Sequence, residues 1–488
     1  MNTSSSVLVA TIYTLTPTHC GTGSTSGAVD LPIARESHTQ LPILPASGIK
    51  GSLRSRLKNE ARDGSGGLDE QRLKALFGPD VQSDSDGLSA GALAFTEGHL
   101  LVYPIRTLSH PWLYVTAPFL LDRVNREYRA ITSRKEPLLS AGVSPEGGQV
   151  LTANPALEGK PLMLEDFLYP GGDVNYSDSL QVLVEEIASL LPEAETETLK
   201  RLKTHLVLIS DGEFIQLLQH AIPVQARIKL NERKTTTDDG GNLWYEEQLP
   251  SDCLFTSFVL PRPGSTSNQT RESLSELEQA CTDLRFLQLG GNETVGQGLC
   301  WWRLHSESSL TSRGARGTAT GNTGGGSQLR RQDGRQGQIN RPPGQRLASP
   351  PTWANSKEST STVSKQKAPL SLTAERQRFL YEKLKSTHRK SVLTELSGLP
   401  VQLRQSGLNV TLLDLLRRGG PARTVADWLT EWLMVKSPAL LVPTARVGDT
   451  QPLVERCLQA NRDEYQALQA EAGLLLVQAK QLAQSLSQ

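Results

Sequence analysis

Short apolar runs with the character of β-strands alternate with helical patterns from the N-terminus to about Leu304. The strand-like runs cover residues 7–15, 92–105, 112–117, 205–209, 222–230, 243–245 and 253–260. Segments with apolar residues at helical spacing lie between them, at residues 68–77, 179–191 and 272–284. Neither a dinucleotide-binding nor a Walker fingerprint accompanies these runs. The pattern therefore predicts an α+β fold for this part of the chain.

After Leu370 the apolar residues follow helical spacing alone. The helical segments cover residues 372–385, 392–396, 410–416, 425–435 and 452–486. This spacing predicts a separate all-helical bundle over residues 369–488. The bundle carries no recognisable catalytic constellation, so we interpret it as an interaction or packing module.

Residues 306–368, between these two patterns, consist mainly of Gly, Ser, Thr, Gln, Pro and Arg. Large apolar residues are nearly absent, so this stretch cannot bury a core and is predicted to be a disordered linker. At 488 residues the chain is also too long for one compact core. We therefore predict a first domain over residues 1–305, the linker, and a helical domain over residues 369–488.

Lysine plus arginine and aspartate plus glutamate each number 51, so the formal net charge is zero. Any nucleic-acid partner must therefore meet local basic patches, because the chain has no overall positive field. The five cysteines are scattered and form no CxxC pair, which argues against a disulfide framework or a zinc site and fits a reducing cytosol. No signal peptide and no long apolar span are recognisable, so we predict a cytoplasmic protein without a membrane segment.

A loop rich in Gly, Ser and Thr follows the first predicted strand, and a turn at residues 45–48 then opens a helix. Apolar residues recur four apart on one stripe of this helix, and basic residues recur likewise on the neighbouring stripe. These stripes are Ile49, Leu53 and Leu57, and Lys50, Arg54 and Lys58. Ser47 is expected to be the N-cap. The amides of the first turn, with Lys50 beside them, form a site suited to a phosphate, and a solvated basic face is the alternative.

Two strand-like arms within residues 225–247 flank a polar stretch with Asp239-Gly240 near its tip, which predicts a long β-hairpin. Basic residues lie on the first arm, and Trp244 and Tyr245 lie on the second. Aromatic rings that stack on bases, beside cations that hold phosphates, suit a single-stranded nucleic acid. A surface hairpin with its aromatic side chains packed into the domain is the alternative.

Four glycines occur in the stretch Gly-Gly-Asn-Glu-Thr-Val-Gly-Gln-Gly from Gly290 to Gly298. Such a stretch lets the backbone approach another group closely, and phosphates are the first candidate. No Gly-Lys-Ser/Thr follows, so it is not a P-loop. A tight turn before a strand is the alternative.

Several motifs, taken together and in order, resemble one family. They are the stretch from Pro17 to Leu57, the runs Gly91-Ala-Leu-Ala-Phe-Thr-Glu and Leu100-Leu-Val-Tyr-Pro-Ile-Arg, the segment Val115-Thr-Ala-Pro-Phe, Trp244-Tyr245-Glu246-Glu247, and the glycine-rich stretch after Gly290. As a set they are similar to the backbone RAMP subunit of the type III-B CRISPR (Cmr) complex. The helical part from about Ser371 resembles the small α-helical subunit of the same complex, which is ordinarily a separate chain.

The resemblance implies a ferredoxin-like, RRM-like RAMP core with a β-hairpin thumb, followed by the separate all-α bundle. Copies of such a subunit stack along a guide CRISPR RNA, and each thumb displaces a nucleotide of the guide–target duplex. The implied activity is that of an RNA-guided endoribonuclease, which cuts complementary target RNA at regular intervals with a divalent metal ion, Mg²⁺ or Mn²⁺. The implied partners are guide RNA, target RNA, other copies of the chain and the other subunits of the effector complex.

The resemblance also assigns roles to individual residues. Asp30 corresponds to the catalytic aspartate, which is also the candidate metal ligand, and His19 corresponds to a histidine of the same loop. Lys50 and the loop from Gly290 to Gly298 correspond to positions that grip the guide backbone. Together with the first turn and basic stripe of the helix, the residues predicted to bind RNA are Ser47, Lys50, Arg54, Lys58, Gly290, Gly291, Thr294, Gly296 and Gly298. The thumb hairpin would present Arg227, Lys229, Arg233, Trp244, Tyr245 and Glu246.

RNA can be cut by its own 2′-hydroxyl, which attacks the next phosphate and leaves a 2′,3′-cyclic phosphate. The protein then needs to hold the in-line geometry and to assist the movement of protons and charge. An extruded base permits that geometry, a carboxylate serves as base or metal ligand, and an imidazole assists proton transfer. Two other functions stay open: a structural RNA-binding filament subunit that does not cut, and a stand-alone nuclease that trims guide precursors. By itself, an aspartate such as Asp30 more often caps a turn.

Overall fold

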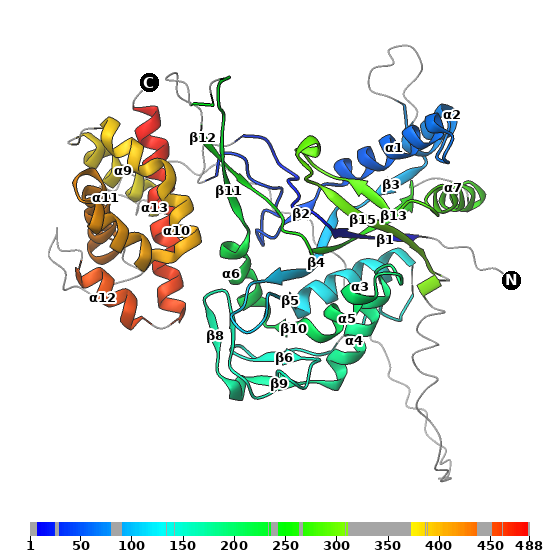
Figure 1. The fold of residues 1–488 in the computed structure, drawn as a ribbon, viewed down its shortest axis with the longest axis horizontal. Coiled ribbons are helices and arrows are strands. Elements are labelled where there is room, and N and C mark those ends of the chain that lie inside the picture. Colours follow the sequence, from blue (N-terminus) through cyan, green and yellow to red (C-terminus); the bar gives the residue numbers. More distant parts are fainter. Residues whose placement is uncertain are drawn as a thin grey trace, which may run out of the picture.

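The computed structural model of the chain describes residues 7–24, 29–79, 90–132, 134–140, 142–232, 234–235, 243–262, 267–307, 309–310, 372–385, 387, 389–436, 451–460 and 462–486. A large sheet with helices on both faces occupies the part before residue 311, and the elements described after residue 371 are all helical (Figure 1). From residue 311 onward, the predicted linker lies outside the described residues.

The strands are β1 (Leu8–Thr14), β2 (Ile43–Leu44), β3 (Leu93–Phe95), β4 (Gly98–Ile105), β5 (Leu113–Thr116), β6 (Val150–Thr152), β7 (Leu162–Leu164), β8 (Phe167–Tyr169), β9 (Val174–Tyr176), β10 (Leu206–Ile209), β11 (Val224–Ile228), β12 (Leu243–Glu247), β13 (Leu254–Pro261), β14 (Phe286–Gln288) and β15 (Leu299–Ser306). The helices of the first part are α1 (Ala46–Asp63), α2 (Glu70–Phe77), α3 (Pro118–Thr132), α4 (Asp178–Ser189), α5 (Thr196–His205), α6 (Asp211–Ala221) and α7 (Ser267–Ala280), with short 3₁₀ turns at Gly171–Asp173 and Glu293–Val295. The second part consists of α9 (Leu372–Lys385), α10 (Arg389–Arg418), α11 (Gly420–Glu431), α12 (Gln451–Gln459) and α13 (Arg462–Ser485), with a π turn at Trp432–Lys436.

Within the described residues, eleven strands form one mixed sheet in the order β14-β15-β1-β13-β4-β5-β10-β6-β9, with β2 paired to β4 and β3 to β13. Neighbouring strands from β14 to β5 are antiparallel. By contrast, β10 runs parallel to β5, and β9 runs parallel to β6. The hairpin of β11 and β12 and the hairpin of β7 and β8 are separate from this sheet.

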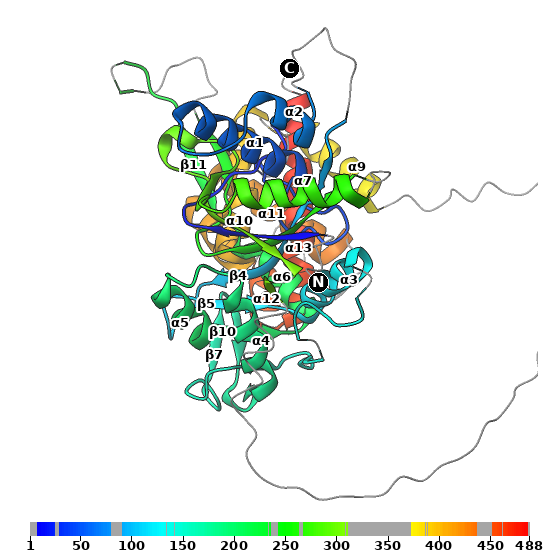
Figure 2. The same ribbon diagram turned by 90° about the vertical axis from the view of Figure 1, so that its right-hand side faces the viewer.

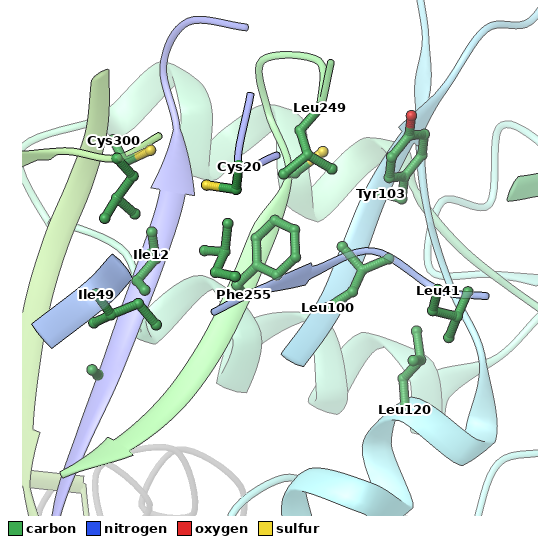
Figure 3. Packing of buried hydrophobic residues seen from close by; sticks show 14 of the residues in the cluster. Ile12, Cys20, Leu41, Ile49, Leu100, Tyr103, Leu120, Leu249, Phe255 and Cys300 are labelled. Carbon is green, nitrogen blue, oxygen red and sulfur yellow. The ribbon is translucent and has the colours of Figure 1, made fainter. Parts of the chain in front are cut away.

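β1 lies inside the sheet and is buried along its whole length. Its alternate residues point to opposite faces, as a strand requires. Leu8 and Ile12 belong to the core that includes α1 and α7, whereas Val9 and Tyr13 belong to the core that includes α3 and α4 (Figure 2). Figure 3 shows Ile12 close to Ile49 of α1 in the first of these cores. Helices on both faces explain why this strand is apolar almost throughout.

The predicted apolar stripe of α1 is confirmed, because Ile49, Leu53 and Leu57 are fully buried. The predicted N-cap is wrong. The helix begins before Ser47, with Pro45 in the N-cap position and no side chain capping the first turn. Pro45 sets this start, because its ring fixes φ near −58° and its carbonyl accepts the Ile49 amide at 3.0 Å. Ser47 therefore lies inside the first turn and is exposed.

The part after residue 371 is helical, as its spacing predicts, but two boundaries differ. Residues 392–396 and 410–416 belong to one element, α10, which contains Pro400 and changes direction at Gly407. Residues 452–486 are divided between α12 and α13. Apolar side chains of α9 to α13 form a core of their own, in which Trp432 is buried.

Among the helices of the described residues, none combines the length and the apolar character that crossing a membrane requires. The five cysteines are all buried with free thiols. Burial raises the pKa of the Cys20 thiol to about 12, so it behaves as an uncharged core side chain (Figure 3).

Candidate functional site

The loop that follows β1 is held against β12. The Leu31 amide donates to the Tyr245 carbonyl at 3.0 Å, and the Leu31 carbonyl accepts the Glu247 amide at 3.0 Å. Beside this bridge, Asp30 Oδ2 accepts the Tyr245 amide at 2.9 Å. The Asp30 side chain keeps 34% of its surface exposed. The main chain of β12 therefore orients the carboxylate while solvent can still reach it.

His19 is bound to the same edge of β12. Its Nδ1 lies 2.7 Å from the Glu247 carbonyl oxygen, which only accepts hydrogen bonds, so Nδ1 carries the proton and Nε2 is left to accept one. Tyr245 and Glu247 are two residues apart on the strand, a spacing of about 7 Å. The structure thus brings Asp30 and His19 to neighbouring anchor points on one strand.

A cavity of about 410 Å³ lies beside His19. It is bounded by the loop after β1, the start of α1 and the glycine-rich loop between β14 and β15. The lining residues are His19, Cys20, Gly21, Gly23, Leu44, Pro45, Ser47, Gly48, Ile49, Leu289, Gly290 and Gly291. The first-turn amides of α1 have no acceptors within the helix, so this end of the helix favours a bound anion.

Lys50 follows the lining residue Ile49 on α1. Burial, and then the Arg54 guanidinium, hold the pKa of the Lys50 ammonium below its ordinary value. Arg54 and Lys58 are directed away to Glu70 of α2, with nitrogen–oxygen distances of 4.0 and 3.2 Å. Of the three predicted RNA-binding cations of α1, Lys50 is therefore the one without an ion pair among the described residues.

Close contacts within the protein shape the loop between β14 and β15. Gly290 has a φ of +78°, and a Cβ there would lie 2.2 Å from the His19 carbonyl oxygen. Gly298 has a φ of +82°, and a Cβ there would lie 2.1 Å from a main-chain oxygen of Leu289. These contacts favour the tight-turn interpretation for both glycines. Gly291 lines the cavity together with Gly290, but a Cβ at Gly291 would lie no closer than 4.0 Å to another atom. The other predicted loop residues, Thr294 and Gly296, are exposed and do not line the cavity.

The predicted hairpin is present as β11 and β12, with Arg227 opposite Trp244. Lys229 is exposed, and Trp244 and Tyr245 are half-buried. Predicted thumb residue Arg233 and residues 236–242 at the tip lie outside the described residues.

Glu246 lies at the base of this hairpin and is buried, with 3% of its surface exposed. Its Oε1 accepts a hydrogen bond from Asn292 Nδ2 at 2.6 Å and lies 3.5 Å from Arg227 Nη2. His19 Nδ1 is 4.0 Å from the same oxygen. Glu246 therefore ties the hairpin to the glycine-rich loop through Asn292, and it holds the charge of Arg227 at the hairpin base.

The helical part contacts this region through α10 and α13, which lie beside β11 and α6 (Figure 1). Lys480 Nζ of α13 lies 3.5 Å from Asp30 Oδ1. Arg404 of α10 pairs with Glu247. Two further contacts are the hydrogen bond from Gln405 Nε2 to the Val224 carbonyl at 3.0 Å and the packing of Val401 with Val29 and Val224.

Neither Lys480 nor Arg404 was predicted from the sequence. A signal for Lys480 exists, because Leu476, Ala479 and Ala483 around it on α13 are all buried. A lysine within the buried face of a helix indicates a partner for its charge. No such sequence pattern marks Arg404, because its contact with Glu247 forms only when α10 packs against the hairpin.

The described residues contain no group of three or more His, Cys, Asp or Glu side chains that could hold a metal ion. Asp30 is a single carboxylate, with Oδ2 bonded to the Tyr245 amide and Oδ1 beside the Lys480 ammonium. This donor set does not fit a divalent ion held by the protein alone. Mg²⁺ held by one carboxylate takes its other ligands from water and from substrate phosphates. The predicted Mg²⁺ or Mn²⁺ therefore stays a prediction about the RNA-bound state.

Residues 11–301 match the RAMP superfamily. The chain is 32% identical over 292 residues to the CRISPR system Cmr endoribonuclease Cmr4 of Pyrococcus furiosus, an alignment that covers 59% of this chain and 92% of the relative. It is 25% identical over 305 residues to the CRISPR system CMR subunit Cmr4 of Saccharolobus solfataricus, which covers 59% of this chain and 93% of that relative. The crystal structure of oligomeric Cmr4 from Pyrococcus furiosus is 26% identical, with a TM-score of 0.46 over 62% of this chain and 98% of that one.

The family match runs from β1 to β15 and so includes the loop after β1, the cavity and the hairpin. It covers more than half of the chain, and the Pyrococcus furiosus relative is covered over nearly its whole length. The chain therefore belongs to the RAMP superfamily.

Proposed function

We propose that this chain is the RNA-guided endoribonuclease subunit of a type III CRISPR effector complex, like the Cmr4 proteins that it resembles. It binds guide RNA in a filament with other copies of itself and with other subunits, and it cuts complementary target RNA at regular intervals. The observation that carries this proposal is the anchoring of Asp30 and His19 on one edge of β12, next to the cavity at the N-terminus of α1.

Asp30 is the general base of the proposed reaction. The Tyr245 amide holds Oδ2, so Oδ1 is the oxygen that takes the proton from the 2′-hydroxyl beside the scissile bond. The 2′-oxygen then attacks the adjacent phosphorus, and the bond from phosphorus to the 5′-oxygen breaks. The products are a 2′,3′-cyclic phosphate and a 5′-hydroxyl.

His19 assists the departure of the 5′-oxygen. Its ring orientation is fixed by the bond from Nδ1 to the Glu247 carbonyl. When Nε2 is protonated, it gives its proton to the leaving oxygen and so prevents the build-up of negative charge there.

The cavity and the hairpin hold the RNA strands. The first-turn amides of α1 and the Lys50 ammonium bind phosphates of the guide, and Gly291 lets the backbone approach. The hairpin of β11 and β12 acts as the thumb, with the exposed Lys229 and the half-buried Trp244 displacing a nucleotide of the guide–target duplex. Displacement matters because a stacked nucleotide cannot reach the in-line geometry.

The finer architecture is part of this proposal. The antiparallel order β15-β1-β13-β4, with α1 between β1 and β4 and α7 between β13 and β15 along the chain, supports a ferredoxin-like core. The separate core of α9 to α13 supports a small-subunit-like domain over residues 369–488, joined through a linker over residues 306–368. A divalent ion, Mg²⁺ or Mn²⁺, would bind to Asp30 and RNA phosphates together.

Asp30→Asn tests the proposed function, because it keeps the size and the acceptor for the Tyr245 amide but removes the basic carboxylate. In the assembled complex, the single-turnover rate of target cleavage should fall by roughly 10²- to 10⁴-fold. Guide affinity should not change. The matched control is Asp122→Asn, which alters an exposed aspartate of α3 and should leave both unchanged.

Regularly spaced cuts that persist in Asp30→Asn would instead support a structural filament subunit, with another subunit doing the cutting. Cleavage of guide precursors by the isolated chain, without any target, would support the trimming nuclease. Both outcomes contradict the proposed function.

A further inference from the structure

Lys480 is a charged side chain that is buried where the helical part contacts the loop after β1. Only 5% of the side chain is exposed, and its neighbours on α13 belong to the helical core. A buried ammonium is costly unless an opposite charge lies close to it. Asp30 Oδ1 lies 3.5 Å from Nζ and supplies that charge.

Contacts made by a second helix, α10, also hold the helical part against the hairpin. Arg404 of α10 pairs with Glu247, two residues after the Tyr245 amide that binds Asp30. Gln405 Nε2 donates to the Val224 carbonyl at 3.0 Å on the other arm of the hairpin. The contact between Lys480 and Asp30 is therefore one of several that dock the helical part on the base of the hairpin.

The two oxygens of Asp30 have different partners. The Tyr245 amide binds Oδ2, and the Lys480 ammonium faces Oδ1. Together the two partners fix the plane of the carboxylate group. A carboxylate has about four acceptor positions, so Oδ1 keeps one for a substrate hydroxyl.

We propose that Lys480 is a positioning residue of the Asp30 site, so that the helical part completes the ribonuclease. Lys480 orients the Asp30 carboxylate, and the exposed 34% of the Asp30 side chain meets the RNA. This inference is based on the proposed function. The opposite role, in which the ammonium covers Asp30 and blocks the substrate, makes the opposite prediction for the rate.

The test compares variants of the full-length chain, loaded with guide RNA, in single-turnover cleavage of a complementary RNA. Lys480→Met suits burial and removes the charge, and Lys480→Arg keeps the charge. Lys383→Met is the matched control, because Lys383 pairs with Glu431 inside the helical part. Each variant is measured for its maximal rate, its half-saturating RNA concentration and its melting temperature.

Lys480→Met should lower the maximal rate by about 10- to 100-fold, as the loss of an orienting partner does, and leave the half-saturating concentration unchanged. Lys480→Arg should recover most of the rate. Lys383→Met should leave the rate unchanged.

A rate in Lys480→Met that is unchanged or raised would overturn the positioning role, and a raised rate would identify a blocking contact. An equal loss in Lys383→Met, or no recovery in Lys480→Arg, would also overturn it, since the effect would then come from the bundle as a whole. These outcomes differ from failure of the proposed function, in which Asp30→Asn itself cuts normally.

Discussion

Glu247 is the residue at which three separate parts of the chain meet. Its side chain is 2% exposed and lies beside Arg35, at 2.9 Å, and Arg404. Its Oε2 also accepts the Ile33 amide at 3.2 Å. Burial by itself would raise the pKa of this carboxyl group. The two guanidinium groups and the hydrogen bonds outweigh burial, so the pKa lies below the ordinary glutamate value.

Replacing this carboxylate should reduce stability in a pH-dependent way. Because the folded-state pKa is depressed, the ion pairs contribute fully above the ordinary glutamate pKa, and their contribution is lost as pH falls through the folded-state value. Glu247→Gln should therefore lower the free energy of unfolding by about 2 kcal/mol at neutral pH. It should also flatten the loss of stability as pH falls below the ordinary glutamate pKa. Urea unfolding at a series of pH values measures both effects.

Glu158→Gln is the control for this experiment, because Glu158 is exposed. It should change the free energy of unfolding by less than about 0.5 kcal/mol. A Glu247→Gln profile that runs parallel to the wild-type profile over the whole pH range would contradict the role assigned to the ion pairs.

At the scale of elements, the turn between β14 and β15 offers two adjacent glycines with different surroundings. Gly290→Ala places a Cβ at a positive φ and 2.2 Å from the His19 carbonyl oxygen, and should cost about 2 kcal/mol or more of stability. Gly291→Ala has open space, with the nearest atom, His19 Cδ2, at 4.0 Å, and should be neutral to within about 0.5 kcal/mol. Urea unfolding of the two variants tests the difference.

Measuring guide affinity then separates the structural role of this turn from its proposed role in binding RNA. Gly291 lines the cavity, so Gly291→Ala should weaken guide binding without loss of stability. Equal stability of the two variants would show that the turn can relax around His19. Undiminished guide binding by Gly291→Ala would show that no RNA approaches the backbone there.

Helix α1 was predicted because its buried face, with Ile49, Leu53 and Leu57, is apolar throughout. α3 was not predicted, because polar residues interrupt its buried face. Arg123 Nη2 lies 3.0 Å from Glu36 Oε2, and Asn125 exchanges two hydrogen bonds with the main chain of Leu139. These partners come from other elements, so a local pattern cannot reveal them. Strands β6 to β9 have three residues each, too few for an alternating signal.

The residues of the candidate site likewise fall into those that the sequence could predict and those that it could not. Asp30 and His19 lie in one loop, so their proximity could be anticipated, whereas the approach of Gly291 from a distant loop could not. Arg54 and Lys58 share the spacing of Lys50, yet Glu70 of α2 binds them, and no helical pattern contains that information. Contacts made by the helical part, above all that of Lys480, depend on how two separately folded cores dock.

At the scale of the whole molecule, the helical part docks on the hairpin base and the opening loop of its own chain. Besides the ion pairs of Lys480 and Arg404, Gln469 Nε2 lies 3.2 Å from His220 Nδ1 of α6. Burial, and then the neighbouring Arg404, lower the pKa of His220, so this ring is uncharged at neutral pH. The predicted linker of about sixty residues would span on the order of 40 Å, which also permits docking on a neighbouring copy.

Arg404→Glu tests whether the ion pair with Glu247 holds the two parts together. The substitution places two carboxylates against each other, and like charges across an interface disfavour it by several kcal/mol. We expect a larger radius of gyration in small-angle X-ray scattering of the isolated chain. Arg417→Glu is the matched control on the same helix, because Arg417 is 77% exposed and contacts Asp414, not the first part. An Arg404→Glu scattering curve that superimposes on the wild-type curve would mean that the apolar contact of Val401 and the hydrogen bonds of Gln405 and Gln469 are enough to keep the helical part docked.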